Sequence, residues 1–246
     1  MLELKNITVE VEGKTVLGNI SMEIQDGEKF ALFGPNGSGK TSLLMAIMGF
    51  SGYLVTTGSI VFNGTEINKL STDERARLGI GLMFQRPPTL KGVRLRQMLD
   101  VVKSKGFNTQ GEAAKFNMEG FLDREINAGF SGGELKRSEL FQLLASSPTL
   151  ALFDEPESGV DLENMELVGR MMNSILRTKD GNSALIITHT GYIFEYVEAD
   201  RGCVLVGGQV HCFGNPRDIL DTVREHGYEG CVACHRKRPK KSHNRK

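Results

Sequence analysis

The eight residues from Gly34 to Thr41, GPNGSGKT, constrain the fold of this 246-residue chain more than any other feature. They fit the pattern G-x-x-x-x-G-K-[ST]. They follow an apolar stretch with strand character, Lys29–Phe33, and they open a segment rich in helix formers, Thr41–Phe50. In this context glycines let the backbone wrap around phosphate groups, and the N–H groups that start the helix attract negative charge. The sequence therefore predicts a phosphate-binding loop between a strand and a helix.

Two side chains of this loop have specific expected roles. Lys40 would reach the β- and γ-phosphates of a nucleoside triphosphate, and the hydroxyl of Thr41 would bind Mg²⁺. A structural glycine turn without a ligand is the alternative, and the flanking strand and helix disfavour it. The residues expected to bind the nucleotide are Gly34, Pro35, Asn36, Gly37, Ser38, Gly39, Lys40, Thr41 and Ser42.

A second carboxylate site follows the apolar run Leu150–Phe153, which ends in Asp154 and Glu155. A buried strand of a parallel sheet delivers its last residues to the carboxyl edge, where ligands bind in open α/β sheets. We expect Asp154 to hold Mg²⁺, mostly through water, and Glu155 to polarise an attacking water. The alternative is a pair of acids that only ends a strand.

Segments typical of strands alternate with segments typical of helices, which predicts an α/β fold with a mainly parallel core sheet. The first 30 residues alternate apolar and polar residues around a turn at Glu12-Gly13-Lys14, so we expect an antiparallel β subdomain there. Between Pro87 and Asn127 the pattern is polar and helical, with helices expected at Val93–Lys103 and Gln110–Leu122. A helical subdomain is thus expected over about residues 87–146, inserted into a domain of residues 1–228.

Composition excludes several classes of protein. No apolar run approaches the ~18 residues of a membrane span, the N-terminus lacks a signal-peptide layout, and four cysteines are too few for a disulfide scaffold. We expect a cytoplasmic chain without membrane insertion. The net charge of zero divides into seven basic residues in 236–246 and a net charge of −7 elsewhere, from 23 basic and 30 acidic residues. An acidic body argues against DNA binding.

Further motifs follow in order along the chain, and together they resemble those of ABC-type ATPases over residues 1–228. Ser131-Gly-Gly-Glu134 is similar to the signature loop, Gln85 to the Q-loop glutamine, Ser158-Gly-Val-Asp161 to the D-loop, and His189 to the switch histidine. The resemblance implies a P-loop ABC nucleotide-binding domain that hydrolyses ATP. The catalytic residues would be Glu155, His189 and Lys40.

In this family two chains sandwich two ATP molecules head to tail, so the resemblance implies an ATP-dependent homodimer. Ser131, Gly132, Gly133 and Glu134 would then face ATP bound to the second copy, and Ser158, Gly159 and Asp161 would form the D-loop. Gln85 would join Thr41 and Asp154 around Mg²⁺. The family usually has an aromatic residue to stack on adenine, and Val11 takes that place here.

Finer details resemble the SufC branch of the family, the ATPases of the SUF iron–sulfur cluster assembly system. The similar segments are Leu82–Pro88, Lys91–Val93, Asn127–Glu139, Asp154–Asp161, Ile186–His189 and His226–Tyr228. The implied partner is a SufB- or SufD-like scaffold, whose shape ATP-driven dimerisation would change. Glu134 and Lys136 stand where transporter ATPases usually have Gln. We hypothesise that Lys136 pairs with Glu155 when no partner is bound and keeps the ATPase idle.

Other functions stay open at this point. The main alternative is the ATPase subunit of a membrane ABC transporter. A nucleic-acid or ribosome-associated ABC protein would have a second ATPase domain or a long coiled coil, and we expect neither from these 246 residues. A non-enzymatic nucleotide-gated scaffold would not need both Glu155 and His189.

Cys231-Val-Ala-Cys234-His235 forms a possible thiol site within residues 229–246, which we expect to be a flexible basic tail. Two thiols are half of a zinc or iron–sulfur site. Cys203, Cys212, His211 or His226 would complete the site within the chain, or a second subunit would do so. The alternatives are haem attachment, which requires export, and two thiols with no ligand.

Overall fold

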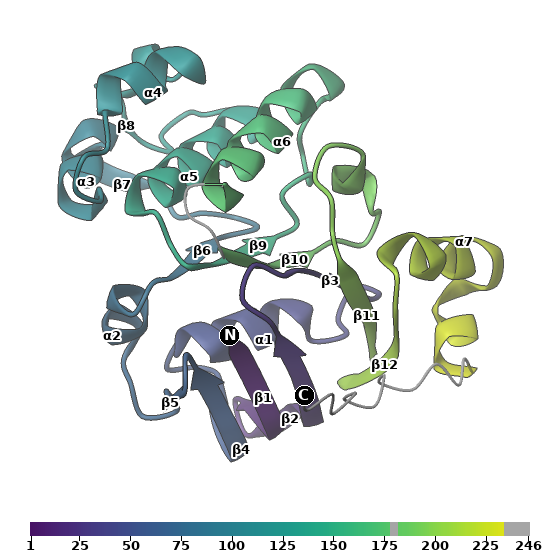
Figure 1. The fold of residues 1–246 in the computed structure, drawn as a ribbon. Helices are drawn as coiled ribbons and strands as arrows, with labels where there is room; N and C mark the ends of the chain where they lie inside the picture. Colours follow the sequence, from purple (N-terminus) through teal and green to yellow (C-terminus); the bar gives the residue numbers. More distant parts are fainter. Residues whose placement is uncertain (178–181, 234–246) are drawn as a thin grey trace, which may run out of the picture.

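An antiparallel sheet forms one layer of the protein, whose computed structural model describes residues 1–177 and 182–233. Its strands lie in the order β2-β1-β4-β5 (Figure 1). Glu12 and Gly13 both adopt positive φ, 49° and 74°, and form the tight turn between β1 and β2. The expected N-terminal hairpin is therefore confirmed. The strands are β1 (Leu2–Val11), β2 (Lys14–Ile24), β4 (Leu54–Phe62) and β5 (Thr65–Glu66).

The second sheet has the order β12-β11-β3-β10-β9-β6, and all its neighbours pair in parallel except β11 and β12. Every residue of β9 and β10 is buried, as expected for strands covered on both faces. The carboxyl ends of the parallel strands therefore meet at one edge. The strands are β3 (Lys29–Phe33), β6 (Ile80–Met83), β9 (Leu150–Asp154), β10 (Ser183–Ile187), β11 (Arg201–Val206) and β12 (Gln209–Gly214).

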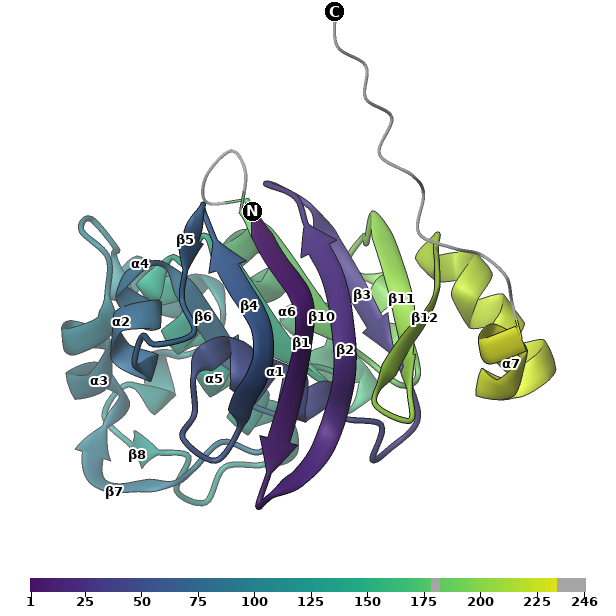
Figure 2. The ribbon, with the colours of Figure 1, turned by 90° about the horizontal axis from the view of Figure 1, so that it is seen from below.

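Helix α1 (Lys40–Met48) lies between the two sheets (Figure 1), and in Figure 2, seen from below, the antiparallel sheet lies in front of it. Its apolar side chains, including Leu43, Leu44 and Ile47, join one buried cluster with residues from both sheets. Helix α2 (Thr72–Arg77) begins with a capping box made by Ser71 and Glu74. Because α1 is held on both sides, the loop that precedes it has a fixed position at the sheet edge.

The other face of the parallel sheet is covered by helices α5 (Gly132–Ser146) and α6 (Leu162–Leu176), which pack on each other (Figure 1). The chain between β6 and α5 forms the remaining small elements on this side. They are β7 (Leu90–Arg94), α3 (Leu95–Val102), α4 (Thr109–Lys115), a 3₁₀ helix (Glu119–Phe121) and β8 (Glu125–Ile126). A second 3₁₀ helix covers Tyr192–Glu195.

The helix expected at Gln110–Leu122 is shorter than predicted. Helix α4 ends at Lys115, and Asn117 adopts a left-handed φ of 54°. This turn lets both Phe116 and Met118 enter the core, where neither is exposed. The helix expected from Val93 likewise starts at Leu95, because Leu90–Arg94 pairs with β8 as a strand.

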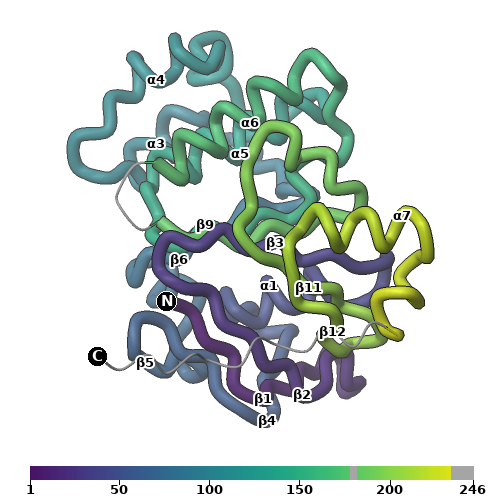
Figure 3. The backbone as a smooth tube through the Cα atoms, turned by 45° about the vertical axis from the view of Figure 1, so that its right-hand side comes forward, coloured from purple at the N-terminus to yellow at the C-terminus, as the bar shows by residue number. Residues whose placement is uncertain are grey.

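Helix α7 (Pro216–Ala233) packs beside β11 and β12, as the tube in Figure 3 shows. Gly227, with φ 65° and ψ −176°, bends it. The helix continues five residues past the expected boundary at residue 228, because Cys231 is fully buried against the cluster that holds Phe33 and Val204. The rest of the expected tail lies outside the described residues. Within the described part of the chain, no helix is long and apolar enough to cross a membrane.

Candidate active site

The phosphate loop has a backbone that only glycine fits at two of its positions. Gly34 and Gly39 have φ values of 156° and 102°. A Cβ atom on Gly34 would lie 2.3 Å from the carbonyl oxygen of Leu205, and one on Gly39 would lie 2.6 Å from Cδ2 of Leu17. Any larger residue there would displace the loop from β11 or β2, so the sequence dictates this close approach.

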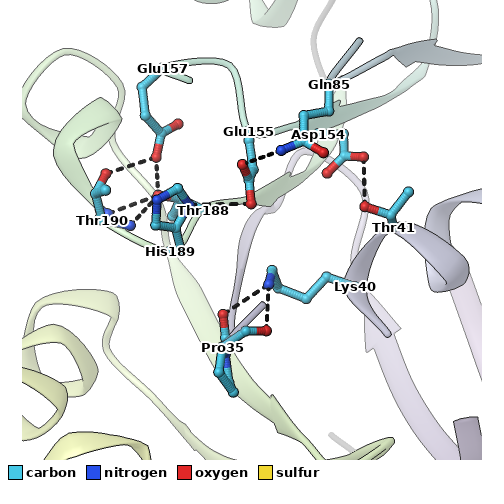
Figure 4. Close-up of polar contacts among 12 residues, drawn as sticks. Pro35, Lys40, Thr41, Gln85, Asp154, Glu155, Glu157, Thr188, His189 and Thr190 are labelled. Carbon is cyan, nitrogen blue, oxygen red and sulfur yellow. Dashed lines mark hydrogen bonds and ion pairs between the residues drawn. The ribbon is translucent and has the colours of Figure 1, made fainter. Parts of the chain in front are cut away.

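Lys40 points back over the loop. Its ammonium Nζ donates to the carbonyl oxygens of Gly34 at 2.8 Å and Pro35 at 2.9 Å (Figure 4). The side chain is buried, which lowers the pKa of Lys40, while the nearby Glu155 and Asp154 oppose that shift. A buried cation whose hydrogen bonds go to neutral carbonyls is well placed to receive an anion.

Ser38 gives a second sign that the loop is built for a ligand. Its hydroxyl oxygen is buried and has no hydrogen-bond partner among the described residues. Such unpartnered buried polar atoms are rare in folded proteins and commonly meet a water, an ion or a ligand. The loop as a whole therefore fits the phosphate groups that the sequence predicts.

Thr41 and Asp154 lie together at the edge of the sheet. The hydroxyl of Thr41 donates to Oδ2 of Asp154 at 2.9 Å. Asp154 ends β9 and is 1% exposed, and its burial raises the pKa of the carboxyl group. A hydroxyl and a carboxylate are oxygen ligands of the kind Mg²⁺ prefers, and the buried carboxylate would gain from a cation. These two residues fit a magnesium site.

Glu155 is held by two neighbours that reach it from different loops. The amide Nε2 of Gln85 donates to its Oε2 at 2.6 Å, and Nδ1 of His189 lies 3.2 Å from its Oε1. Glu155 is buried and has a left-handed φ of 48°, a conformation that is costly for a residue with a side chain and that recurs at functional sites. Gln85 thus contacts Glu155 here, and its predicted role at Mg²⁺ stays a prediction.

The pairing hypothesised between Lys136 and Glu155 is wrong for this state of the protein. The ammonium of Lys136 donates instead to the backbone carbonyls of Gln85 at 2.9 Å and Phe84 at 3.4 Å. Burial lowers the pKa of Lys136, and Glu155 is the weakest of the four carboxylates that oppose this shift. The side chain stabilises the backbone after β6, which carries Gln85, while Glu155 turns toward Gln85 and His189.

The signature segment starts helix α5. Ser131 is its N-cap residue, its hydroxyl accepts from the backbone N–H of Glu134 at 3.3 Å, and the Glu134 carboxylate accepts from the backbone N–H of Ser131 at 2.7 Å. This second bond is the largest cause that lowers the pKa of Glu134. A negatively charged group at a helix N-terminus is stabilised by the helix dipole.

The signature segment packs on the D-loop of the same chain. A Cβ atom on Gly132 would lie 2.3 Å from the carbonyl oxygen of Gly159, and one on Gly133 would lie 3.2 Å from the side chain of Asn164. Asp161 caps helix α6 through the backbone N–H of Asn164. Ser131 and Gly132 are exposed, as a site for a ligand bound to another subunit requires, while Ser158 is half-buried beside Gly159.

Three residues that the sequence analysis did not single out lie beside His189. Thr188 and Thr190 flank it, and both of their hydroxyls donate to Oε1 of the buried Glu157 (Figure 4). The only signal in the sequence is the pair of threonines around the histidine. Tyr228 was cited only for resemblance, and its hydroxyl lies 3.5 Å from the carbonyl oxygen of His189.

Two predicted sites gain no support from their surroundings. Val11 is half-buried at the end of β1 and pairs with Lys14, so its predicted contact with adenine stays a prediction. Cys231 is buried, and Cys234 lies outside the described residues. Within residues 1–177 and 182–233, no three histidine, cysteine or acidic side chains gather as metal ligands do.

Comparison with known proteins agrees with this geometry. The family model described as ABC transporter matches residues 17–158. The chain is 34% identical over 247 aligned residues to a probable ABC transporter ATP-binding protein of Streptococcus pyogenes serotype M3, and the match covers 94% of each protein. The name of that relative refers to transport and not to iron–sulfur assembly.

Similar solved structures have the same fold. One is a nucleotide-free ATP-binding cassette from an ABC transporter, with a TM-score of 0.77, 22% identity and coverage of 94% of this chain and 97% of that one. Another is a dimeric, post-hydrolysis ATP-binding cassette bound to ADP and Pi, with a TM-score of 0.72, 24% identity and coverage of 87% and 98%. The predicted α/β nucleotide-binding fold is therefore confirmed.

Proposed function

The chain belongs to the ABC transporter family as an ATP-binding subunit with ATPase activity, and we propose that it drives a partner protein by forming an ATP-dependent homodimer. The contact between Glu155 and His189 carries the catalytic part of this proposal. It brings a carboxylate and an imidazole together at the sheet edge, near the buried Lys40. Phosphoryl transfer to water needs these groups at one place.

Each residue has a part in the reaction. Lys40 and the N–H groups of the loop from Gly34 to Thr41 bind the β- and γ-phosphates of ATP. Glu155 accepts a hydrogen bond from the attacking water and takes its proton. His189 orients Glu155 through Nδ1 and contacts the γ-phosphate when ATP is bound.

Thr41 and Asp154 would hold Mg²⁺, and Gln85 would join them after leaving Glu155. When bound, Mg²⁺ neutralises charge on the phosphate oxygens. The oxygen donors and the buried, desolvated Asp154 carboxylate support this assignment.

The dimer supplies the groups that a single chain lacks. The signature segment of one copy faces the γ-phosphate of the ATP bound to the other copy; its residues are Ser131, Gly132, Gly133 and Glu134. The D-loop lies at the interface between the two copies; its residues are Ser158, Gly159 and Asp161. The exposed signature serine at a helix N-terminus supports this arrangement, because such a terminus attracts anions. A solved structure with the same fold is dimeric with ADP and Pi bound.

Two partners are candidates, and we place both on the cytoplasmic side of the cell. The first is a membrane transporter, which the name of the Streptococcus relative favours. The second is a SufB/SufD-like scaffold for iron–sulfur clusters, which only the segments similar to the SufC branch favour. The names of the relatives fit the transporter function better.

Capture of the tagged full-length chain from its source cells, followed by mass spectrometry, separates these candidates. A multi-span membrane protein would establish the transporter function. A scaffold without membrane spans would establish the cluster-assembly function and direct attention to Cys231 and Cys234. Recovery of neither class with either ADP or ATP present would contradict the proposal that the chain drives a partner.

A further inference from the structure

The carboxylate of Glu157 and the hydroxyls of Thr188 and Thr190, together called the clasp below, hold the loop that carries His189. Oε1 of Glu157 accepts hydrogen bonds from the hydroxyls of Thr188 and of Thr190, the latter at 3.0 Å (Figure 4). Glu157 is only 8% exposed and follows Glu155 by two residues in the loop after β9. The clasp therefore joins the loop of the carboxylate to the loop of the histidine.

The two hydroxyls have little freedom to turn elsewhere. Thr188 Oγ1 accepts from the backbone N–H groups of Thr190 at 3.2 Å and of Gly191 at 2.8 Å, and Thr190 Oγ1 accepts from the backbone N–H of Tyr192 at 3.2 Å. A hydroxyl has one proton and two acceptor positions. Because backbone groups occupy acceptor positions, each proton is available for Glu157. The backbone conformation of the loop and its attachment to Glu157 thus depend on each other.

His189 lies between Thr188 and Thr190, the two residues whose hydroxyls donate to Glu157. Its side chain is 38% exposed, and its Nδ1 contacts Oε1 of Glu155. The pairs Glu155–His189 and Glu157–Thr190 connect the same two loops, so they form one closed set of contacts. An exposed imidazole has few packing contacts of its own, and its distance from Glu155 depends on how the threonines are held.

We propose that Glu157 is a positioning residue that sets the placement of His189 against Glu155. This inference rests on the roles given to His189 and Glu155 under the proposed function. Glu157 acts through the two threonine hydroxyls, whose hydrogen bonds its Oε1 accepts. The two threonine hydroxyls need an acceptor oxygen at this position. E157Q therefore keeps the positioning function and E157A loses it.

The test is a double-mutant cycle on ATP turnover with the full-length protein. We compare wild type, E157A, H189A and E157A/H189A, and measure kcat and the Kd for ATP of each. E157A should lower kcat about tenfold or more and leave the Kd within about threefold, as expected when an interaction acts mainly in the transition state. In the H189A background E157A should lower kcat by less than about twofold, because the residue it positions is gone.

Matched variants complete the design. E157Q should retain kcat within about threefold of wild type, since its carbonyl oxygen accepts the same two hydrogen bonds. E166A, which removes an exposed glutamate of α6, should behave as wild type. If E157A does not fold, T190V removes one donor of the clasp at an exposed position and takes its place in the cycle.

Three results would overturn the inference. E157A could lower kcat by the same factor with and without His189, which would mean that it acts by another route. It could raise the Kd as much as it lowers kcat, which would indicate general damage to the site. H189A could retain wild-type turnover, which would remove the role given to His189 and with it the inference. If H189A lowers turnover but the double-mutant cycle shows no coupling to E157A, only the inference fails and the ATPase function stands.

Discussion

Nδ1 of His189 lies 3.2 Å from Oε1 of Glu155, and the two residues lie in the loops that follow the neighbouring parallel strands β10 and β9. The other carboxylate oxygen of Glu155 accepts from Gln85 at 2.6 Å. A carboxylate so held can face an attacking water without turning first. In the proposed function this pair joins a general base to the group that orients it, an arrangement that activates water in many hydrolases.

Loss of either member of this pair should stop catalysis without stopping binding. We expect E155Q and H189A each to lower kcat for ATP hydrolysis by about a hundredfold or more, the usual contribution of general acid–base groups. Titration with a fluorescent ATP analogue should give a Kd within about threefold of wild type. Turnover within a few-fold of wild type in both variants would contradict this assignment of the catalytic groups.

The contact between Gly132 and Gly159 predicts a separate defect. A Cβ atom at residue 132 would lie 2.3 Å from the backbone oxygen of Gly159, so G132A should displace the D-loop and the start of α5. Turnover should fall about tenfold or more, while ATP binding by the single chain is kept. G120A is the matched control, because a Cβ there meets open space. Equal activity of the two variants would argue against a functional contact.

Removal of the Arg75 side chain is expected to lower the stability of the protein and not its activity. Its guanidinium is buried and donates to the carbonyl oxygens of Ala46 and Ile47 at the end of α1, and to those of Asn68 and Leu70. R75A should lower the free energy of unfolding by about 3 kcal/mol, since buried acceptors lose a charged donor. Urea denaturation measures this.

R77A is the control for that measurement. The pair Arg77–Asp73 is exposed on both sides, and such pairs contribute about 1 kcal/mol or less. A stability loss for R75A no larger than that for R77A would contradict the structural role given to Arg75.

Glu157 predicts a pH dependence of stability. Burial raises its pKa, and the hydrogen bond from Thr188 only partly opposes this. The folded carboxyl group therefore binds a proton more tightly than the unfolded one, and its contribution to stability falls as pH rises from its ordinary pKa of 4.5 through the raised pKa. The stability of E157Q relative to wild type should grow over this range and then stay constant. Urea denaturation of the ATP-free proteins at several pH values measures it, and a difference that shrinks with pH would contradict the argument.

The sequence predicted the parallel sheet, the N-terminal hairpin and the phosphate loop because their signals are local. A glycine pattern between a strand and a helix allows few backbones, and Glu12-Gly13 can form a turn at positive φ without help from the rest of the fold. The carboxylates of Asp154 and Glu155 were located by the same reasoning, since the end of a buried strand fixes where the next residues lie.

Contacts between distant segments could not be predicted in this way. Lys136 was expected at Glu155, but the carbonyl oxygens after β6 lie closer to its ammonium group, and no pattern in the sequence encodes that choice. The end of α4 at Lys115 depends on Phe116 and Met118, which both enter the core because the chain turns at Asn117 between them. The contact between Glu157 and Thr190 depends on the pairing of β9 with β10, which brings the loops after these two strands together.

In the proposed function, ATP joins two copies of this chain through the signature segment, and sedimentation of E155Q measures whether it does. With hydrolysis blocked and binding kept, E155Q in ATP and Mg²⁺ should sediment with twice the 27.1 kDa mass of the chain, and it should return to the monomer without nucleotide. K40A, which lacks the ammonium group proposed to bind phosphate, should stay monomeric with and without ATP. If E155Q binds ATP and still sediments as a monomer at every concentration, the account of an ATP-driven dimer is wrong.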